Sequence, residues 1–401
     1  MSYGNQYKKM LLLSLLLLSW PFDACRAAPE ASSYEEKRKE TNDIAVTIVV
    51  SGLGCTCARF ADDMKNVLND LQPGGLRVLP VLGVGGLQNV DDILFLKGID
   101  MGVVDEDNLR LVKQKNPSLY ANIEQRIQYI TKLYNSEFHV LARDEIKSYD
   151  DLRGKKVNFN LKSSQTEATA EVIFNALHID VQRTNFDNDD AIEKLKNGEI
   201  AAHIVLSGAP QAALAKVRKE DGVHFLSLDE ESLPKHDLST INTAYLPAEL
   251  SHELYPNLIP EGTTVPTIAN RALLVAYASP EGSFRYNKLV KFVDEFFGKI
   301  GQFQSRARHP KWKEINLSAE IPGWTRFKPA ADWLAAHQNL ASARADSSSE
   351  LPPELKPAFE RFIEDYAASA RHRSLTTSER EKLFSQFMGY MESQKANQPA
   401  R

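Results

Sequence analysis

The sequence predicts an α/β protein of two similar lobes joined by a two-stranded hinge. Two stretches about one lobe apart share one plan, in which a helix, a glycine break and an acidic residue lead into a buried strand. They cover residues 91–104 and 189–206. Two apolar segments, 138–142 and 272–278, bracket the second stretch, as two connecting strands would. The alternative is that both segments are ordinary strands within one large domain.

The first residues have the pattern of a secretory signal peptide. A basic start precedes an apolar run at residues 10–20, and small residues follow at 24–28. The run is too short to span a bilayer comfortably, and no other apolar run is long enough. We therefore expect cleavage after Ala27, export to the periplasm, and a mature chain without a membrane span. A lipid anchor on Cys25 is less favoured, because the residues before it fit a lipoprotein site poorly.

The remaining chain divides by composition and by apolar periodicity. Residues after the signal peptide are charged and serine-rich and predict a loose linker. A second stretch rich in alanine, serine and acids predicts another linker before two amphipathic tail helices. The expected organisation is a signal peptide at 1–27, a linker at 28–42, a first lobe at 43–137 and 272–340, a second lobe at 138–271, a linker at 341–352, and a helical tail at 353–401.

Composition and motifs argue against several classes of function. The net charge is −5 and no long basic run occurs, which argues against a general nucleic-acid binder. Neither a Ser/His/Asp pattern, a Walker loop nor an H-E-x-x-H motif is present. Paired acids stand where predicted helices begin, a position that suits the helix dipole. The sequence therefore indicates a binding protein that is not an enzyme and needs no cofactor or metal.

A hydroxyl-rich turn between a predicted strand and a predicted helix is the candidate ligand site. Residues 156–159 alternate like a strand, residues 162–166 read Lys-Ser-Ser-Gln-Thr, and apolar residues recur at helical spacing from 168. A helix start offers free backbone N–H groups and the positive end of a dipole, which can hold a carboxylate or a phosphate. The alternative is an ordinary helix cap, since Ser and Thr cap many helices.

Several segments also occur in the order and spacing of one known family. They are a glycine–asparagine loop at 85–90, a strand ending at Asp105, a run Asp-Leu-Arg-Gly-Lys-Lys-Val at 151–157, a Ser-Gly-Ala-Pro loop at 207–210 and a return to the hinge at 255–275. In these the chain resembles the TAXI-type solute-binding subunits of tripartite ATP-independent periplasmic (TRAP) transporters. The resemblance implies a type II periplasmic-binding-protein fold, here with a helical C-terminal extension. It also implies hinge closure on a small organic anion and delivery to TRAP permease subunits in the membrane.

The resemblance and the predicted strand ends together define the expected ligand-binding residues, because ligands of open α/β sheets lie beyond the carboxyl ends of the strands. Lys162 or Arg59 would supply a balancing positive charge, whereas Glu167 would repel an anion. The turn at 163–166 lacks both glycines of the family's Gly-Ser-Gly-Thr. The expected set is Gly52, Gly54, Cys55, Phe60, Asn89, Asp105, Ser163, Ser164, Thr166, Ser207, Gly208 and Ala209.

Two other functions compete with this interpretation. In an exported protein, Cys55 and Cys57 could form a disulfide or bind a soft metal such as copper, which would make the chain a redox or metal-handling protein. Two thiolates alone do not complete a zinc site, and His139 and His203 lie in predicted strands. The chain could also be a sensory or structural subunit whose cleft no longer binds a solute and whose tail contacts a partner. The sequence leaves the ligand and the state of the cysteines open.

Overall fold

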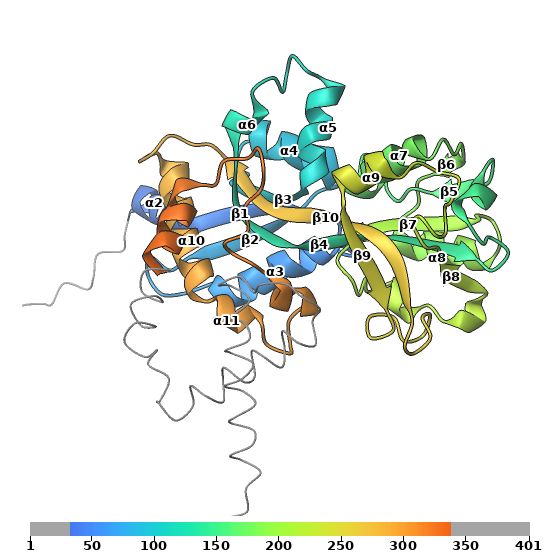
Figure 1. The fold of residues 1–401 in the computed structure, drawn as a ribbon. Coiled ribbons are helices and arrows are strands. Elements are labelled where there is room, and N and C mark those ends of the chain that lie inside the picture. Colours follow the sequence, from blue (N-terminus) through green and yellow to red (C-terminus); the bar gives the residue numbers. More distant parts are fainter. Residues whose placement is uncertain (1–32, 338–401) are drawn as a thin grey trace, which may run out of the picture.

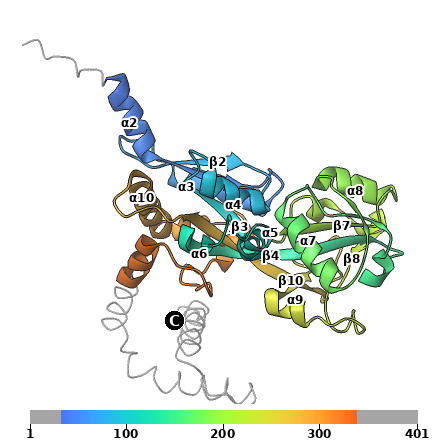
Figure 2. The same ribbon diagram turned by 90° about the horizontal axis from the view of Figure 1, so that it is seen from above.

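The computed structural model describes residues 33–337. Two α/β lobes lie side by side and share one continuous sheet, as Figures 1 and 2 show from two directions. The predicted fold class, two lobes with a two-stranded connection, is therefore confirmed for this part of the chain. The predicted signal peptide and the predicted tail helices lie outside the described residues. Within residues 33–337, every helix is too short or too polar to traverse a lipid bilayer.

The sheet passes from one lobe into the other in the order β2-β1-β3-β10-β4-β7-β5-β6, with β8 paired to β4 and β9 paired to β10. Neighbours among β1, β2 and β3 are parallel, as are β5, β6 and β7. The strands are β1 (Ala45–Val50), β2 (Arg77–Leu82), β3 (Met101–Asp105), β4 (Ile127–Arg143), β5 (Lys156–Asn158), β6 (Gln182–Thr184), β7 (Ala202–Ser207), β8 (Val223–Phe225), β9 (Leu246–Ser251) and β10 (Thr264–Tyr277).

Two long antiparallel strands, β4 and β10, form the connection between the lobes. The first part of β4 pairs with β10 over residues 127–137, and its last part pairs with β7 over residues 137–142. The last part of β10 pairs with β3, and its first part pairs with β9. Each of these strands therefore belongs to both lobes, and the chain crosses between the lobes near Glu137 and Ala269. The apolar segments at 138–142 and 272–278 predicted the two connecting strands but covered less than half of each.

Each lobe has a sheet with apolar clusters on both faces. In the first lobe, α3 (Thr56–Leu68) and α10 (Phe284–Gly298) pack on one face, and α4 (Gly86–Phe95) and α5 (Glu106–Lys115) pack on the other. Trp312 and Phe327, from the segment after α10, are buried in the first of these clusters. Shorter helices in the same lobe are α6 (Ile123–Arg126) and α11 (Ile300–Phe303).

The second lobe repeats this plan. Here α7 (Gln165–Ala176) covers one face of the sheet together with the short α9 (Ser239–Ala244), and α8 (Asn188–Lys196) covers the other. The two repeated stretches in the sequence correspond to α4 followed by β3 and to α8 followed by β7. The internal repeat was therefore a correct indication of two lobes built alike. Single 3₁₀ turns at Tyr149–Leu152, Leu214–Lys216, Lys219–Asp221 and Pro310–Glu314 complete the described elements.

Two local predictions were wrong. The segment expected to be a loose linker forms a helix, α2 (Tyr34–Ile44), which projects from the first lobe in Figure 2. Its residues have no apolar face, but a capping box at Ser33 and an ion pair between Lys37 and Glu40 (3.0 Å) stabilise it. The sequence after the glycine-rich loop predicts Asn89 or Asp91 as the cap of the next helix, but both lie within α4, whose cap is Gly85 with a φ of 87°. Glycine adopts this left-handed conformation without the strain of a side chain.

Candidate functional site

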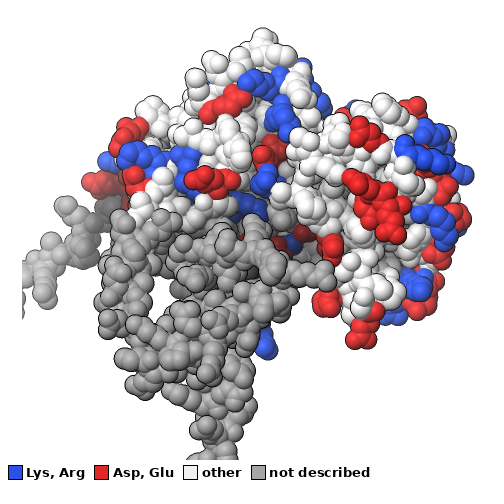
Figure 3. Space-filling view, in the orientation of Figure 1, with Lys and Arg blue, Asp and Glu red and all other residues white. Residues whose placement is uncertain are grey.

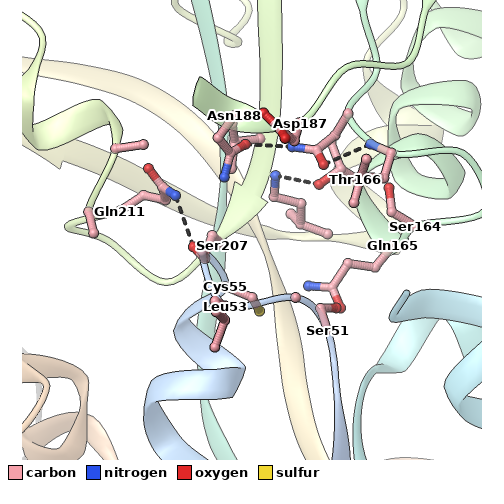
Figure 4. A pocket seen from close by; sticks show the side chains of 18 of the residues that line it. Ser51, Leu53, Cys55, Ser164, Gln165, Thr166, Asp187, Asn188, Ser207 and Gln211 are labelled. Atoms are coloured by element: carbon pink, nitrogen blue, oxygen red, sulfur yellow. Dashed lines mark hydrogen bonds between the residues drawn. The ribbon is translucent and has the colours of Figure 1, made fainter. Parts of the chain in front are cut away.

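A cavity of about 400 Å³ lies between the lobes (Figure 4). In the first lobe its wall is formed by the loop after β1, at residues 51–55, and by Val84, which follows β2. The second lobe contributes the start of α7, the start of α8, and the end of β7 with the loop that follows. These segments all follow parallel strands, at the edge of an open α/β sheet where ligands bind. The volume lies at the small end of the usual range for small-molecule sites, roughly 300–1,000 Å³.

The structure brings one part of the expected set together around this cavity. The expected residues that line it come from three separate segments of the sequence, two in the second lobe and one in the first. The lining members of the expected set are Gly52, Gly54, Cys55, Ser164, Thr166 and Ser207.

Hydrogen bonds across the interlobe boundary hold the cavity closed on one side. The Thr56 hydroxyl donates to the Gly208 carbonyl (2.8 Å), and the Thr56 backbone N–H donates to Ser207 Oγ (3.3 Å). From the second lobe, Gln211 Nε2 donates to the Gly54 carbonyl (3.0 Å). Thr56 and Gly54 belong to the first lobe, so these bonds form only when the lobes are together. Gly208, expected to contact a ligand, instead contacts the opposite lobe.

Phe60 and Asn89 do not line the cavity, which corrects the expectation for both. Phe60 is fully buried and stacks on Trp312, with 3.9 Å between the ring centroids. It lies on the apolar face of α3, and packing rather than ligand contact explains the aromatic residue there. Asn89 is also fully buried, and its Nδ2 donates to the Val103 carbonyl (3.0 Å), which fixes α4 against β3.

Asp105 is likewise turned into the interior, where it accepts a hydrogen bond from Ser136 Oγ (3.1 Å). Burial and the neighbouring Asp107 raise the pKa of Asp105 well above its usual value. Asp107 itself joins the lobes, because its Oδ2 accepts hydrogen bonds from Thr169 Oγ1 (2.7 Å) and from the Tyr245 hydroxyl (3.1 Å), both in the second lobe. The buried acids of this strand end therefore belong to the lobe interface and not to the cavity wall.

Ala209 also has a structural role, at the point where the lobes are connected. Its backbone N–H donates to Glu137 Oε2 (2.7 Å), and Glu137 Oε1 pairs with the buried Lys311. Burial raises the pKa of Glu137, and Lys311 opposes that shift. Ala209 is 1% exposed, so it has no surface left for a solute.

The start of α7 has the geometry expected of a site where backbone N–H groups bind an anion. Ser164 is the N-cap, and its hydroxyl oxygen accepts the Glu167 N–H (3.2 Å). Glu167 does not face the cavity, because its carboxylate accepts the Ser163 N–H (2.6 Å) and a bond from Asn185 (2.9 Å). The repulsion expected from Glu167 is therefore directed elsewhere. Ser163 is exposed with a φ of 64° and does not line the cavity.

Thr166 lines the cavity, but its hydroxyl also has a structural partner. The Leu206 N–H donates to Thr166 Oγ1 (3.0 Å), which ties the first turn of α7 to the end of β7. Its own hydroxyl proton remains able to donate to a bound group. A substitution of Thr166 would therefore change the protein even where no ligand is bound.

The charges around the cavity differ from the expected ones. Arg59 pairs with Asp63 (3.5 Å) on the first lobe, and Lys162 is exposed outside the lining. Within residues 33–337, the charged residues that line the cavity are instead Asp187, Asp189 and Lys216, and all three are exposed to solvent. On the face shown in Figure 3, acidic and basic side chains are interspersed over the second lobe, so this face offers no continuous basic area to a polyanion.

Cys55 and Cys57 are joined by a disulfide. Cys55 lines the cavity and caps α3, where its sulfur accepts the Cys57 N–H (3.1 Å). Cys57 is buried, and its sulfur accepts the Ser51 N–H (3.3 Å). Among residues 33–337, no three His, Cys, Asp or Glu side chains gather in a way that could hold a metal ion.

The two strand histidines are structural. His139 Nε2 accepts from the Tyr255 hydroxyl (2.8 Å), and that hydroxyl accepts the Gln211 N–H (2.8 Å). This chain of bonds positions Gln211 at the cavity. Burial lowers the pKa of His139 to about 4 and that of His203 to about 3, so both rings are neutral at physiological pH.

The amides that line the cavity are absent from the residues expected from the sequence, although the sequence contained a signal for one of them. Gln165 directly follows the N-cap Ser164 within the hydroxyl-rich turn, so its position signalled a residue at the site. Gln211 lies four residues beyond Ser207, in a loop already expected there. Asn160 and Asn188 had no signal, because they reach the cavity only through the folding of the second lobe.

Comparison with known proteins found the following similarities. The periplasmic aliphatic sulphonate binding protein SsuA from Escherichia coli is 17% identical, with a TM-score of 0.37, over 73% of this chain and 78% of that chain. A structure described as a periplasmic transporter is 11% identical, with a TM-score of 0.43, over 76% and 97%. The substrate binding protein of an amino acid ABC transporter is 13% identical, with a TM-score of 0.38, over 67% and 96%. Residues 83–322 match the NMT1-like family, and the chain belongs to that family.

Proposed function

We propose that the protein is an exported, non-enzymatic receptor that captures a small organic solute between its lobes. The observation that carries this proposal is the cavity, which is lined from both lobes and closed by hydrogen bonds between them. A solute bound there contacts both lobes at once, so its binding free energy favours the closed arrangement over an open one. The connection through only two strands, β4 and β10, suits a hinge motion of this kind.

We further propose that the solute bears a carboxylate, held at the start of α7. The first backbone N–H groups of a helix have no partner within the helix, and the dipole there favours negative charge. Ser164 adds a hydroxyl that can donate, and Glu167 is engaged by Ser163 and Asn185. Among the described residues that line the cavity, no cation is buried, so the anion would be held by hydrogen bonds and the dipole, as helix starts hold anions elsewhere.

Delivery to TRAP-type permease subunits in the membrane completes the proposal. It is supported by the resemblance of the sequence to TAXI-type subunits and by the signal-peptide pattern at residues 1–27. The competing metal-handling function is less favoured, because the two sulfurs that would bind the metal are bonded to each other. The alternative of a sensory or structural subunit that no longer binds a solute is less favoured, because the cavity between the lobes is large enough for a small molecule.

The test is to purify the full-length protein from its native host and to release any bound molecule for mass spectrometry. We expect one small carboxylate in near-stoichiometric amount, which on return should raise the melting temperature. Metal analysis of the same sample separates the competing functions. Stoichiometric copper, or the absence of any organic molecule together with no thermal shift from a panel of carboxylates, would contradict the proposal.

A further inference from the structure

One cavity side chain has hydrogen-bonding groups without a partner. Gln165 is the first residue of α7, lines the cavity and is 5% exposed. Among residues 33–337, neither its amide oxygen nor its amide nitrogen is bonded to another residue, and Figure 4 shows the side chain extending toward Ser51 of the opposite lobe. The side chain as a whole is buried, but its amide faces the space of the cavity, where a bound group can pair with it. The amide of Gln165 is therefore placed to bind a group that enters the cavity.

Each of the other amides of the cavity has at least one partner within the protein. Asn160 Nδ2 donates to Asn188 Oδ1 (2.6 Å). Gln211 donates to the Gly54 carbonyl and accepts the Leu214 N–H (2.8 Å). Their orientation is set by the protein itself, whereas that of Gln165 is left to the ligand.

The chemistry of the lining indicates which group Gln165 binds. An amide offers a donor and an acceptor, whereas a carboxylate only accepts and an ammonium only donates. A neutral group that both donates and accepts can therefore satisfy both ends of the amide. A second carboxylate at this position would be buried without a cation, because the charged lining residues Asp187, Asp189 and Lys216 are exposed at the rim.

The shape of the ligand is limited by the walls. None of the described residues that line the cavity is aromatic, so a planar ring would find no stacking partner. The apolar contacts come from aliphatic side chains, among them Val84, Val205 and Leu206. An aliphatic chain between two polar ends matches these walls.

We propose that Gln165 determines specificity, and that the solute is an aliphatic monocarboxylate whose far end is uncharged and both donates and accepts hydrogen bonds, as a carboxamide or a hydroxyl does. This inference rests on the proposed function, which places the carboxylate at the start of α7. It adds the nature of the second end and the residue that recognises it.

The test uses straight-chain carboxylates of three to six carbons that end in carboxamide, hydroxyl, carboxylate, ammonium or methyl, titrated calorimetrically into the full-length protein. We expect the best carboxamide or hydroxyl probe to bind about tenfold more tightly than the dicarboxylate, ammonium and methyl probes of equal length. A dicarboxylate or ammonium probe that binds most tightly would overturn the inference but leave the receptor function standing. If no probe of any class binds, the proposed function fails with it.

Two variants isolate the role of Gln165. Gln165→Met keeps the length of the side chain and should lower affinity for the carboxamide probe about tenfold while changing that for the methyl probe less than twofold. Gln165→Glu suits a helix start and should shift preference toward the ammonium probe. Gln125→Glu, at an exposed position in α6, is the matched control and should change nothing. An equal loss for all probes in both Gln165 variants would show a merely structural role and refute the inference.

Discussion

Gly208→Ala should introduce a steric clash between the two lobes in their closed arrangement. A Cβ atom at this position would lie 3.0 Å from Thr56 Cγ2 and 3.0 Å from Tyr134 Cδ2, closer than such contacts normally are. Thr56 and Tyr134 belong to the first lobe and Gly208 to the second. The backbone of Gly208 does not have a positive φ, so alanine introduces no strain of its own. The clash therefore exists only when the lobes are together.

The expected magnitude follows from overpacking. An extra methyl group in a well-packed site typically costs about 1–3 kcal/mol. If this penalty falls on the closed state alone, the affinity for the solute decreases by roughly 5-fold to 150-fold. The free energy of unfolding of the ligand-free protein should change far less, because the open arrangement relieves the contact.

The assay is titration calorimetry with the co-purified solute, together with urea unfolding of the ligand-free protein. Gly301→Ala is the control, since a Cβ there meets no atom within 4 Å. Unchanged affinity in Gly208→Ala would refute the reasoning. A loss of unfolding free energy as large as the loss of binding free energy would also refute it, because the clash would then exist without closure.

Three further predictions concern buried polar contacts. Lys311→Met leaves the carboxylate of Glu137 buried without a cation, so the free energy of unfolding in urea should decrease by about 3–5 kcal/mol. The additional change Glu137→Gln should restore most of that loss. Thr166→Val removes the acceptor of a buried N–H, so the free energy of unfolding of the ligand-free protein should decrease by about 1–3 kcal/mol. The pKa of His139 is about 4 in the folded protein and 6.5 as a reference, so only the unfolded state gains its proton as pH falls from 6.5 toward 4. Over that window the wild type should lose on the order of 2–3 kcal/mol more stability than His139→Gln, which keeps an acceptor for Tyr255; parallel pH profiles would contradict this.

The sequence predicted the architecture because periodicity and repetition record which faces are buried. The repeated plan around β3 and β7 indicated two lobes, and the apolar segments in β4 and β10 indicated their connection. Helix α2 was missed because its stability comes from a capping box and ion pairs instead of an apolar face. Local side-chain contacts of this kind leave little trace in hydrophobic periodicity.

The site was predicted only in part, because loops after strands mark an edge of the sheet and not the direction of each side chain. Ser164 and Ser207 were placed at the cavity by this rule, but Phe60 and Asp105 follow it equally well and are turned into the interior. Whether a polar side chain has a partner depends on the packing of distant segments. The unpaired amide of Gln165 and the pairing of Glu167 with Asn185 could therefore be found only in the structure.

The central claim is that the two lobes close on a small solute. The most direct test is the distance between spin labels on cysteines introduced at the exposed Asn66 of α3 and the exposed Glu193 of α8, one on each lobe. Pulsed electron paramagnetic resonance on the full-length protein should give a broad distribution of longer label-to-label distances without solute. With the co-purified solute it should give one narrower distribution of shorter distances. A single distribution that is the same in both samples would contradict the account.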